Sequence, residues 1–325
     1  MTLLAAARGG DEAAFEQLVA PHRAELHAHC YRMLASVQDA EDALQEALLG
    51  AWRGLGRFEG RSSLRSWLYK VATNACLRLV ERRPKLVLPV DYGPAADPHD
   101  GLGAPVLEPL WVEPYPDAGL AYEQRESVEL AFIAALQHLP ARQRAVLILS
   151  EVLGFSGAEV AEALDTTPAS VYSALQRAHR TVDERLPRQS QQATLRELGD
   201  ARLRELVGEY VAAWERGDVE AVAALLTDDV TLAMPPRPEW YAGLDAVTAF
   251  LRVTPLHAPN RWRVLPTTAN GQPAVAQYLR DEQGGFTAHG IDVFTLDGDR
   301  ISEFMAFLDG SLFPRFGLPD RLSAE

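Results

Sequence analysis

A chain of 325 residues is long enough for two or three domains, each able to bury its own core. Hydrophobic residues make up 47% and charged residues 23%, a composition that excludes a wholly disordered chain. The sequence has no long apolar run, so no membrane-spanning helix is expected. The formal net charge of −14 argues against nucleic-acid binding when it is taken as one number, because phosphate contacts need a basic surface.

The first segment, residues 1–83, has the apolar spacing of helices and is predicted to be an all-helical domain. Both cysteines, Cys30 and Cys76, lie inside these apolar patterns, so we expect buried thiols and not a disulfide or a zinc site. Charge is uneven along the domain. Residues 11–50 hold two arginines against eight acidic residues, whereas residues 51–83 hold eight basic residues against two glutamates. We therefore expect one face to repel DNA and another to attract it.

A linker is predicted over residues 84–125, because eight prolines precede residue 118 and no helical period is present. Its cluster Trp111–Pro116 is too aromatic for a simple spacer and predicts a docking segment. The interdomain residues expected there are Trp111, Glu113, Pro114 and Tyr115. Helical periodicity resumes over 126–188, which is predicted to be a second all-helical domain.

A helix-turn-helix is the sharpest pattern in the second helical domain. Ser156 caps a first helix, Ala161 permits close packing, and Thr167 caps a second helix that begins with Pro168. In such a motif the second helix enters the major groove of DNA. The residues predicted to face DNA are Pro168, Ala169, Ser170, Ser173, Gln176 and Arg177. An ordinary helical hairpin is the alternative interpretation.

Residues 195–325 predict an α+β domain. Helices are expected over Leu195–Arg216 and Val219–Leu226, followed by strands that are separated by turn signals such as Asn270-Gly271. The expected strands are Val230–Met234, Arg261–Pro266, Ala274–Leu279, Thr287–Thr295 and Ile301–Leu308.

Taken together, the two helical domains resemble the sigma-70 family of RNA polymerase sigma factors, and within it the extracytoplasmic-function (ECF) group. Asp11–Glu16, Asp39–Glu46 and Arg61–Cys76 look like the family's sigma-2 domain. Leu139–Val146 and the helix-turn-helix after it look like the sigma-4 domain. The resemblance covers roughly residues 11–187 and is specific because the motifs occur in combination.

The resemblance implies a factor that binds core RNA polymerase, at the β′ clamp and the β flap, and promoter DNA. An acidic helix would meet the clamp through Asp39, Glu41, Asp42, Gln45 and Glu46. A basic track would follow the single strand of the minus-ten element, and it comprises Arg61, Ser62, Arg65, Lys70, Asn74 and Arg78, with Arg82 and Arg83 beyond them. The sigma-4 helix-turn-helix would read the minus-35 element. On charge alone, the acidic helix is equally typical of a solvated face.

The third part, from about Leu195 to Leu318, resembles SnoaL-like domains of the NTF2-like superfamily, in which helices wrap a cone-shaped sheet around a pocket. Tyr210–Asp218, Leu225–Val230 and Gly290–Phe294 carry this resemblance. It implies a regulatory domain with a possible small-molecule ligand. The expected pocket residues are Trp214, Met234, Trp240, Tyr278, His289, Asp292 and Phe304.

His289 and Asp292 are the candidates for the acid–base chemistry of the superfamily's enzymes. Neither a nucleophile nor a metal set accompanies them in the sequence, so we expect no enzymatic activity and no cofactor. Because the N-terminal apolar stretch also lacks a basic flank, the protein is expected to be cytoplasmic and without a membrane partner.

Two alternatives stay open at this point. One is a SnoaL-type pocket enzyme with a DNA-binding appendage, and the other is a helix-turn-helix repressor that needs no polymerase. The acidic helix distinguishes these alternatives from a sigma factor, because a repressor does not bind polymerase and does not need such a helix.

Overall fold

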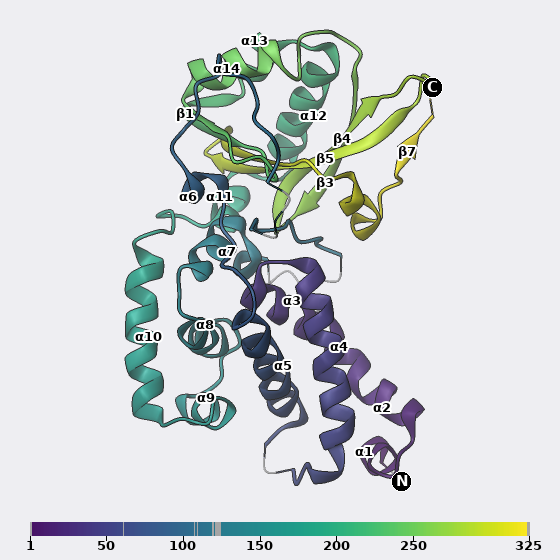
Figure 1. Ribbon diagram of the computed structural model, residues 1–325, viewed down its shortest axis with the longest axis vertical. Helices are drawn as coiled ribbons and strands as arrows, with labels where there is room; N and C mark the ends of the chain where they lie inside the picture. Colours follow the sequence, from purple (N-terminus) through teal and green to yellow (C-terminus); the bar gives the residue numbers. More distant parts are fainter. Residues whose placement is uncertain are drawn as a thin grey trace. The chain divides into compact units, whose positions relative to one another are not determined.

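The computed structural model describes residues 2–60, 62–106, 108, 110–118, 120 and 125–323. The chain forms two compact units (Figure 1). The first unit joins Met1–Leu86 to Gly119–Leu186, and the second joins Val87–Ala118 to Pro187–Glu325. The two predicted helical domains therefore share one unit, and most of the predicted linker belongs to the strand-rich unit.

The first unit is built from helices. Their bounds are α1 Leu3–Arg8, α2 Glu12–Val19, α3 Arg23–Leu34, α4 Val37–Gly54, α5 Leu64–Val80, α7 Leu130–Gln137, α8 Ala141–Leu147, α9 Gly157–Ala163 and α10 Pro168–Asp183. Hydroxyl side chains accept a hydrogen bond from the first turn of five of these helices, at Thr2, Ser36, Ser63, Ser156 and Thr167. The predicted helix-turn-helix is confirmed as α9 and α10.

Buried arginines join the two helical domains within this unit. Arg144 of α8 donates hydrogen bonds to the backbone oxygen of Met33 and, over 2.6 Å, to Gln137 Oε1. Arg32 of α3 donates to Ser127 Oγ over 2.7 Å. Burial lowers the pKa of Arg144 to about 10, because its guanidinium has exchanged water for neutral acceptors.

Both cysteines are buried, as the sequence predicts. Cys30 of α3 and Cys76 of α5 are fully shielded from solvent, and both are free thiols. Burial raises the pKa of the Cys76 thiol well above its ordinary value. The two thiols therefore act as small apolar groups in the core.

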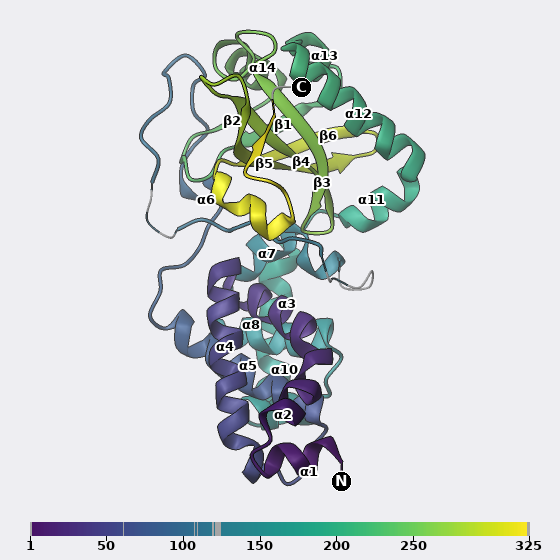
Figure 2. The same cartoon turned by 90° about the vertical axis from the view of Figure 1, so that its right-hand side faces the viewer.

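The second unit is a twisted sheet covered by helices on one face (Figure 2). Its helices are α6 Pro89–Tyr92, α11 Gln191–Leu198, α12 Asp200–Arg216, α13 Val219–Ala223 and α14 Leu244–Val253. Its strands are β1 Leu226–Ala233, β2 Trp240–Ala242, β3 Trp262–Ala269, β4 Gln272–Arg280, β5 Phe286–Asp297, β6 Arg300–Phe307 and β7 Arg321–Leu322. The strand order is β2-β1-β6-β5-β4-β3, with β7 paired to β5.

This topology explains what the sequence pattern predicted. Strands β3 to β6 form an antiparallel meander, whereas β1 pairs in parallel with β6. The Asn270-Gly271 turn between β3 and β4 has φ values of 57° and 68°, the left-handed conformation that its two residues favour. The fold class is that of two helical domains and an α+β domain, as predicted.

Two local predictions were wrong. The helix expected over Leu195–Arg216 is divided into α11 and α12 at Gly199, whose φ of 78° ends one helix before the next begins. The helix expected to reach Leu226 ends at Ala223, and Leu226 begins β1 because it packs into the sheet core. None of the described helices is both long and apolar enough to cross a membrane.

Candidate polymerase and nucleic-acid interface

Helix α4 separates an apolar face from an acidic one. Ala40, Ala43 and Leu44 are buried on one side. The exposed residues on the other side are Glu41, Asp42, Gln45 and Glu46, which we call the acidic stripe. Within it, Glu46 Oε1 lies 2.7 Å from Arg78 Nη2, so one of its charges is already paired.

Asp39 does not belong to this stripe. Its side chain is 6% exposed and forms an ion pair with Arg83. The prediction that Asp39 presents its charge to polymerase is therefore wrong for this conformation. The physical reason is position on the helix: one turn before Ala43, Asp39 lies on the buried side of α4.

The second helix of the helix-turn-helix presents a face of mostly small polar side chains. Val171, Ala178 and Val182 are buried against the domain. The predicted DNA-facing residues Pro168, Ala169, Ser170, Ser173, Gln176 and Arg177 are all exposed. A capping box of Ser156 and Glu159 fixes the start of α9.

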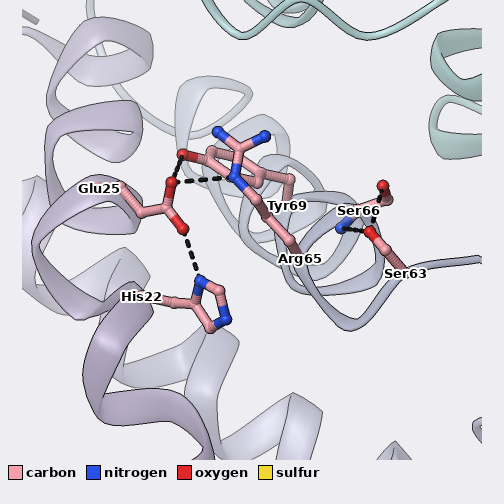
Figure 3. A network of polar contacts seen from close by, with 6 residues as sticks. All are labelled: His22, Glu25, Ser63, Arg65, Ser66 and Tyr69. Atoms are coloured by element: carbon pink, nitrogen blue, oxygen red, sulfur yellow. Dashed lines mark hydrogen bonds and ion pairs between the residues drawn. The ribbon is translucent and has the colours of Figure 1, made fainter.

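Arg65, expected in the basic track, lies beside Glu25 and Tyr69 (Figure 3). Its Nε donates to Glu25 Oε2 over 3.0 Å, and its guanidinium lies 4.9 Å from the ring of Tyr69 and 5.4 Å from that of Phe155. Tyr69 also donates to Glu25 Oε2, and His22 Nδ1 lies 2.6 Å from Glu25 Oε1. Burial opposes ionisation of Glu25, but these contacts outweigh it and lower the pKa of its carboxyl.

Other members of the basic track are also paired with acids. Lys70 Nζ lies 3.1 Å from Asp165 Oδ1 and donates to the backbone oxygen of Glu162 over 2.7 Å. Arg78 and Arg83 pair with acids of α4 as described above. Ser62 and Asn74 are half-buried, Arg82 is exposed, and Arg61 lies outside the described residues. The track is therefore present but largely neutralised.

A cavity of about 210 Å³ lies between the two helical domains. Its first-domain lining includes Phe58, Ser66 and Trp67, and its second-domain lining includes Glu159 and Glu162 of α9. Trp67 is half-buried, and its ring lies 5.1 Å from that of Phe58 in a tilted contact. Of the residues predicted to follow the minus-ten element, Ser62 and Lys70 line this cavity.

In the second unit, Asp292 is the centre of a buried polar network. Its Oδ2 accepts hydrogen bonds from Tyr210 over 3.2 Å and from Gln277 over 2.5 Å. Burial raises the pKa of Asp292 to about 7, although both hydrogen bonds favour the carboxylate. His289 packs instead on the ring of Trp262 at 5.1 Å, and burial lowers its pKa. The two acid–base candidates, His289 and Asp292, therefore contact different partners.

The other predicted pocket residues divide into three groups. Trp214, Met234 and Phe304 belong to the cluster that fills the space between sheet and helices. Trp240 donates from Nε1 to the backbone oxygen of Gly93 and so binds the linker. Tyr278 points to the opposite face of β4, where it contacts Phe313 and donates to Pro319, so its assignment to the pocket was wrong.

The predicted docking segment lies against the strand-rich domain. Tyr115 donates its backbone N–H to Asn270 Oδ1 over 2.8 Å, and Asn270 returns a backbone hydrogen bond of 2.8 Å. Asp117 Oδ1 accepts from the Gly271 N–H over 2.8 Å. Trp111 is 8% exposed and packs at 5.2 Å on Tyr92.

The sequence analysis did not identify two functional glutamines, Gln191 and Gln192, which follow the second helical domain. Both are buried. Gln191 bonds to the backbone N and O of Leu296, at 2.7 and 3.0 Å. Gln192 donates to Gly271 O over 2.6 Å. In the sequence, the only sign of this contact was a pair of adjacent glutamines at the start of a helical pattern.

Comparison with known proteins decides the family. The chain matches the family models of Sigma-70 region 2 over residues 18–85, Sigma-70 region 4 over 129–182 and the SnoaL-like domain over 207–304. It is 42% identical to the ECF RNA polymerase sigma factor SigG of Mycobacterium tuberculosis, over 97% of this chain and 86% of that one. The chain belongs to the ECF sigma factor family. As an ECF sigma factor, it binds core RNA polymerase and promoter DNA and acts in transcription initiation.

Further relatives of this sigma factor agree. SigM of M. tuberculosis is 34% identical over 54% of this chain and 79% of its own length. The crystal structure of the M. tuberculosis extracytoplasmic function sigma factor SigJ shares the fold, with a TM-score of 0.57 and 23% identity over 92% of this chain and 97% of that one. Membership of the ECF sigma factor family excludes the alternative of a repressor that needs no polymerase.

Proposed function

We propose that the acidic stripe of α4 binds the β′ clamp of core polymerase, and that the second helical domain meets the β flap. The stripe is the part of α4 that points away from the core, and acidic side chains match a basic partner surface. Working with polymerase also places this protein in the cytoplasm. Among the residues that the structure describes, no group of three or more His, Cys, Asp or Glu side chains is arranged to hold a metal ion.

Charge reversal in the stripe tests the polymerase contact. Glu41→Lys with Asp42→Lys should weaken binding to core polymerase at least tenfold at low salt, because two attractions become repulsions. Glu282→Lys, at an exposed acid of the second unit, is the matched control. Affinity is measured by co-purification and titration with labelled core enzyme. Equal affinities for the double variant and the control would exclude α4 as the clamp contact.

Promoter DNA, in this proposal, contacts both helical domains of the first unit. Helix α10 reads the minus-35 element through its exposed face, which includes Ser173 and Arg177. The minus-ten strand follows the basic track past Arg65 and Lys70. Because these cations are paired with Glu25 and Asp165, DNA phosphates must replace those carboxylates.

The C-terminal domain, we propose further, regulates the factor by holding its linker and does not act as an enzyme. The observation that supports this is the Asn270-Gly271 turn, which bonds to Tyr115 and Asp117 before the second helical domain and to Gln192 after it. In its buried site, Asp292 Oδ2 accepts hydrogen bonds from two neutral groups, whereas Oδ1 has no hydrogen-bond partner among the described residues and is left to accept one from a bound ligand.

A further inference from the structure

Tyr172 of α10 is a large side chain left in solvent on the helix that reads DNA. It is 64% exposed, more than any other large hydrophobic residue in the described part of the chain. Val171, beside it, is buried in the domain core. Ala169 and Gln176 lie three residues before and four residues after it, so the three share one face of the helix.

The ring of Tyr172 is seated on Gly157, the first residue of α9. A Cβ at position 157 would lie 3.2 Å from both Cζ and the hydroxyl oxygen of Tyr172, and the three atoms nearest to that added atom all belong to Tyr172. A methyl group at this position would therefore require the ring to move by a few tenths of an ångström. The absence of a side chain at Gly157 thus permits the position at which the ring lies.

The neighbours of Tyr172 on α10 leave its ring accessible. Ala169, Ser170 and Ser173 are short and exposed, and the ring beside them is 64% exposed. Residues in the first turns of a recognition helix contact base edges in the major groove. An aromatic side chain there offers an apolar face to a thymine methyl group and a hydroxyl that can hydrogen-bond.

We propose that Tyr172 is a specificity-determining residue for the upstream promoter element, contacting a base edge, and that Gly157 is its positioning residue. The inference rests on the proposed role of α10 in reading that element. A ring contact with a thymine methyl makes base preference at one or two adjacent positions depend on residue 172.

Transcription from a promoter library with a randomised upstream element tests this, with core polymerase and the full-length factor. Tyr172→Ala should reduce base preference at one or two adjacent positions about 5- to 100-fold and leave the other positions unchanged. Tyr172→Phe should keep most of the preference. Replacing the preferred thymine by uracil removes only the methyl group, and should weaken wild type but not Tyr172→Ala.

Gly157→Ala tests the positioning role, because the three atoms nearest to the added Cβ all belong to Tyr172. It should alter preference at the same positions as Tyr172→Ala and have no further effect in the Tyr172→Ala background. Asp183→Ala, exposed at the far end of α10, is the control. Unchanged preferences in Tyr172→Ala, or an equal loss on all sequences as for a phosphate contact, would overturn the inference. A wild-type factor without any upstream preference would instead refute the proposed reading by α10.

Discussion

Asp292 is a carboxylic acid that the fold holds among neutral partners. Tyr210 comes from α12, Gln277 from β4 and Asp292 from β5, so three elements meet at one oxygen. The sequence placed Asp292 in the pocket but identified neither partner, since nothing in a local pattern reports which distant side chains meet. What could be predicted was the position of Asp292 on the strand that crosses the domain.

Stability of the second unit should therefore fall as pH rises from about 4 to 7. The pKa of Asp292 is raised from 3.8 to about 7, so the folded unit binds the proton more tightly and loses that stabilisation as the proton leaves. The slope should approach 1.4 kcal/mol per pH unit, roughly, near the middle of that range. Asp292→Asn should remove most of it.

Hydrogen exchange of the β4 and β5 amides measures how the stability of the second unit depends on pH. Asp292→Asn and wild type are compared at each pH. Asp297→Asn, at the exposed end of β5, is the control. Parallel pH profiles for wild type and Asp292→Asn would contradict the assignment of this pH dependence to Asp292.

Helices α4 and α5 illustrate how far pattern reasoning reaches at the scale of an element. Apolar spacing and the caps Ser36 and Ser63 predict both helices and their buried faces. Pairing between elements was not predictable, because Arg83 and Asp39 meet only after α4 and α5 have packed. The sequence therefore predicted which basic residues form the track. It did not predict that acidic residues of the same protein form ion pairs with them.

Freeing Lys70 should strengthen single-strand binding. Asp165→Asn removes the charge that pairs with Lys70 and leaves a residue able to keep the positive φ of 49° at this position. Because Asp165 is 81% exposed, its pairing is worth about 0.2–1 kcal/mol, so affinity for a minus-ten oligonucleotide should rise by roughly 1.5- to 5-fold. Fluorescence anisotropy at low salt measures it, with Glu184→Gln as the control. A decrease in affinity would show that Asp165 assists DNA binding.

Across the whole molecule, chain order and spatial order differ. Residues 87–118 precede the second helical domain in sequence yet fold with the C-terminal domain, which begins after residue 187. Composition shifts divided the chain into consecutive segments and could not reveal this, because proline content reports the lack of helix and not the surface that a segment binds. The aromatic cluster at Trp111 and Tyr115 was the one sequence signal that pointed to docking.

The Asn270-Gly271 turn holds both ends of the chain that carries the second helical domain. Tyr115 and Asp117 bind it on the entering side and Gln192 on the leaving side, so loss of either side should lengthen the tether of that domain. When one helical domain is bound to the promoter, the length of the tether sets the effective concentration at which the other domain meets its own promoter element.

Asn270→Gly tests this clamp, because it keeps a residue suited to the φ of 57° while removing the acceptor of the Tyr115 N–H. Hydrogen exchange over residues 111–117 should increase, and promoter output should change in the same direction as in Gln192→Ala and in Trp111→Ala with Tyr115→Ala. Asn260→Gly, at another positive φ in a loop of the same unit, is the matched control. If the linker amides exchange faster in Asn270→Gly while transcription stays at the wild-type level, the clamp orders the linker without regulating the factor. Opposite changes in output from the entering-side and leaving-side variants would show that the two halves of the clamp do not act as one tether.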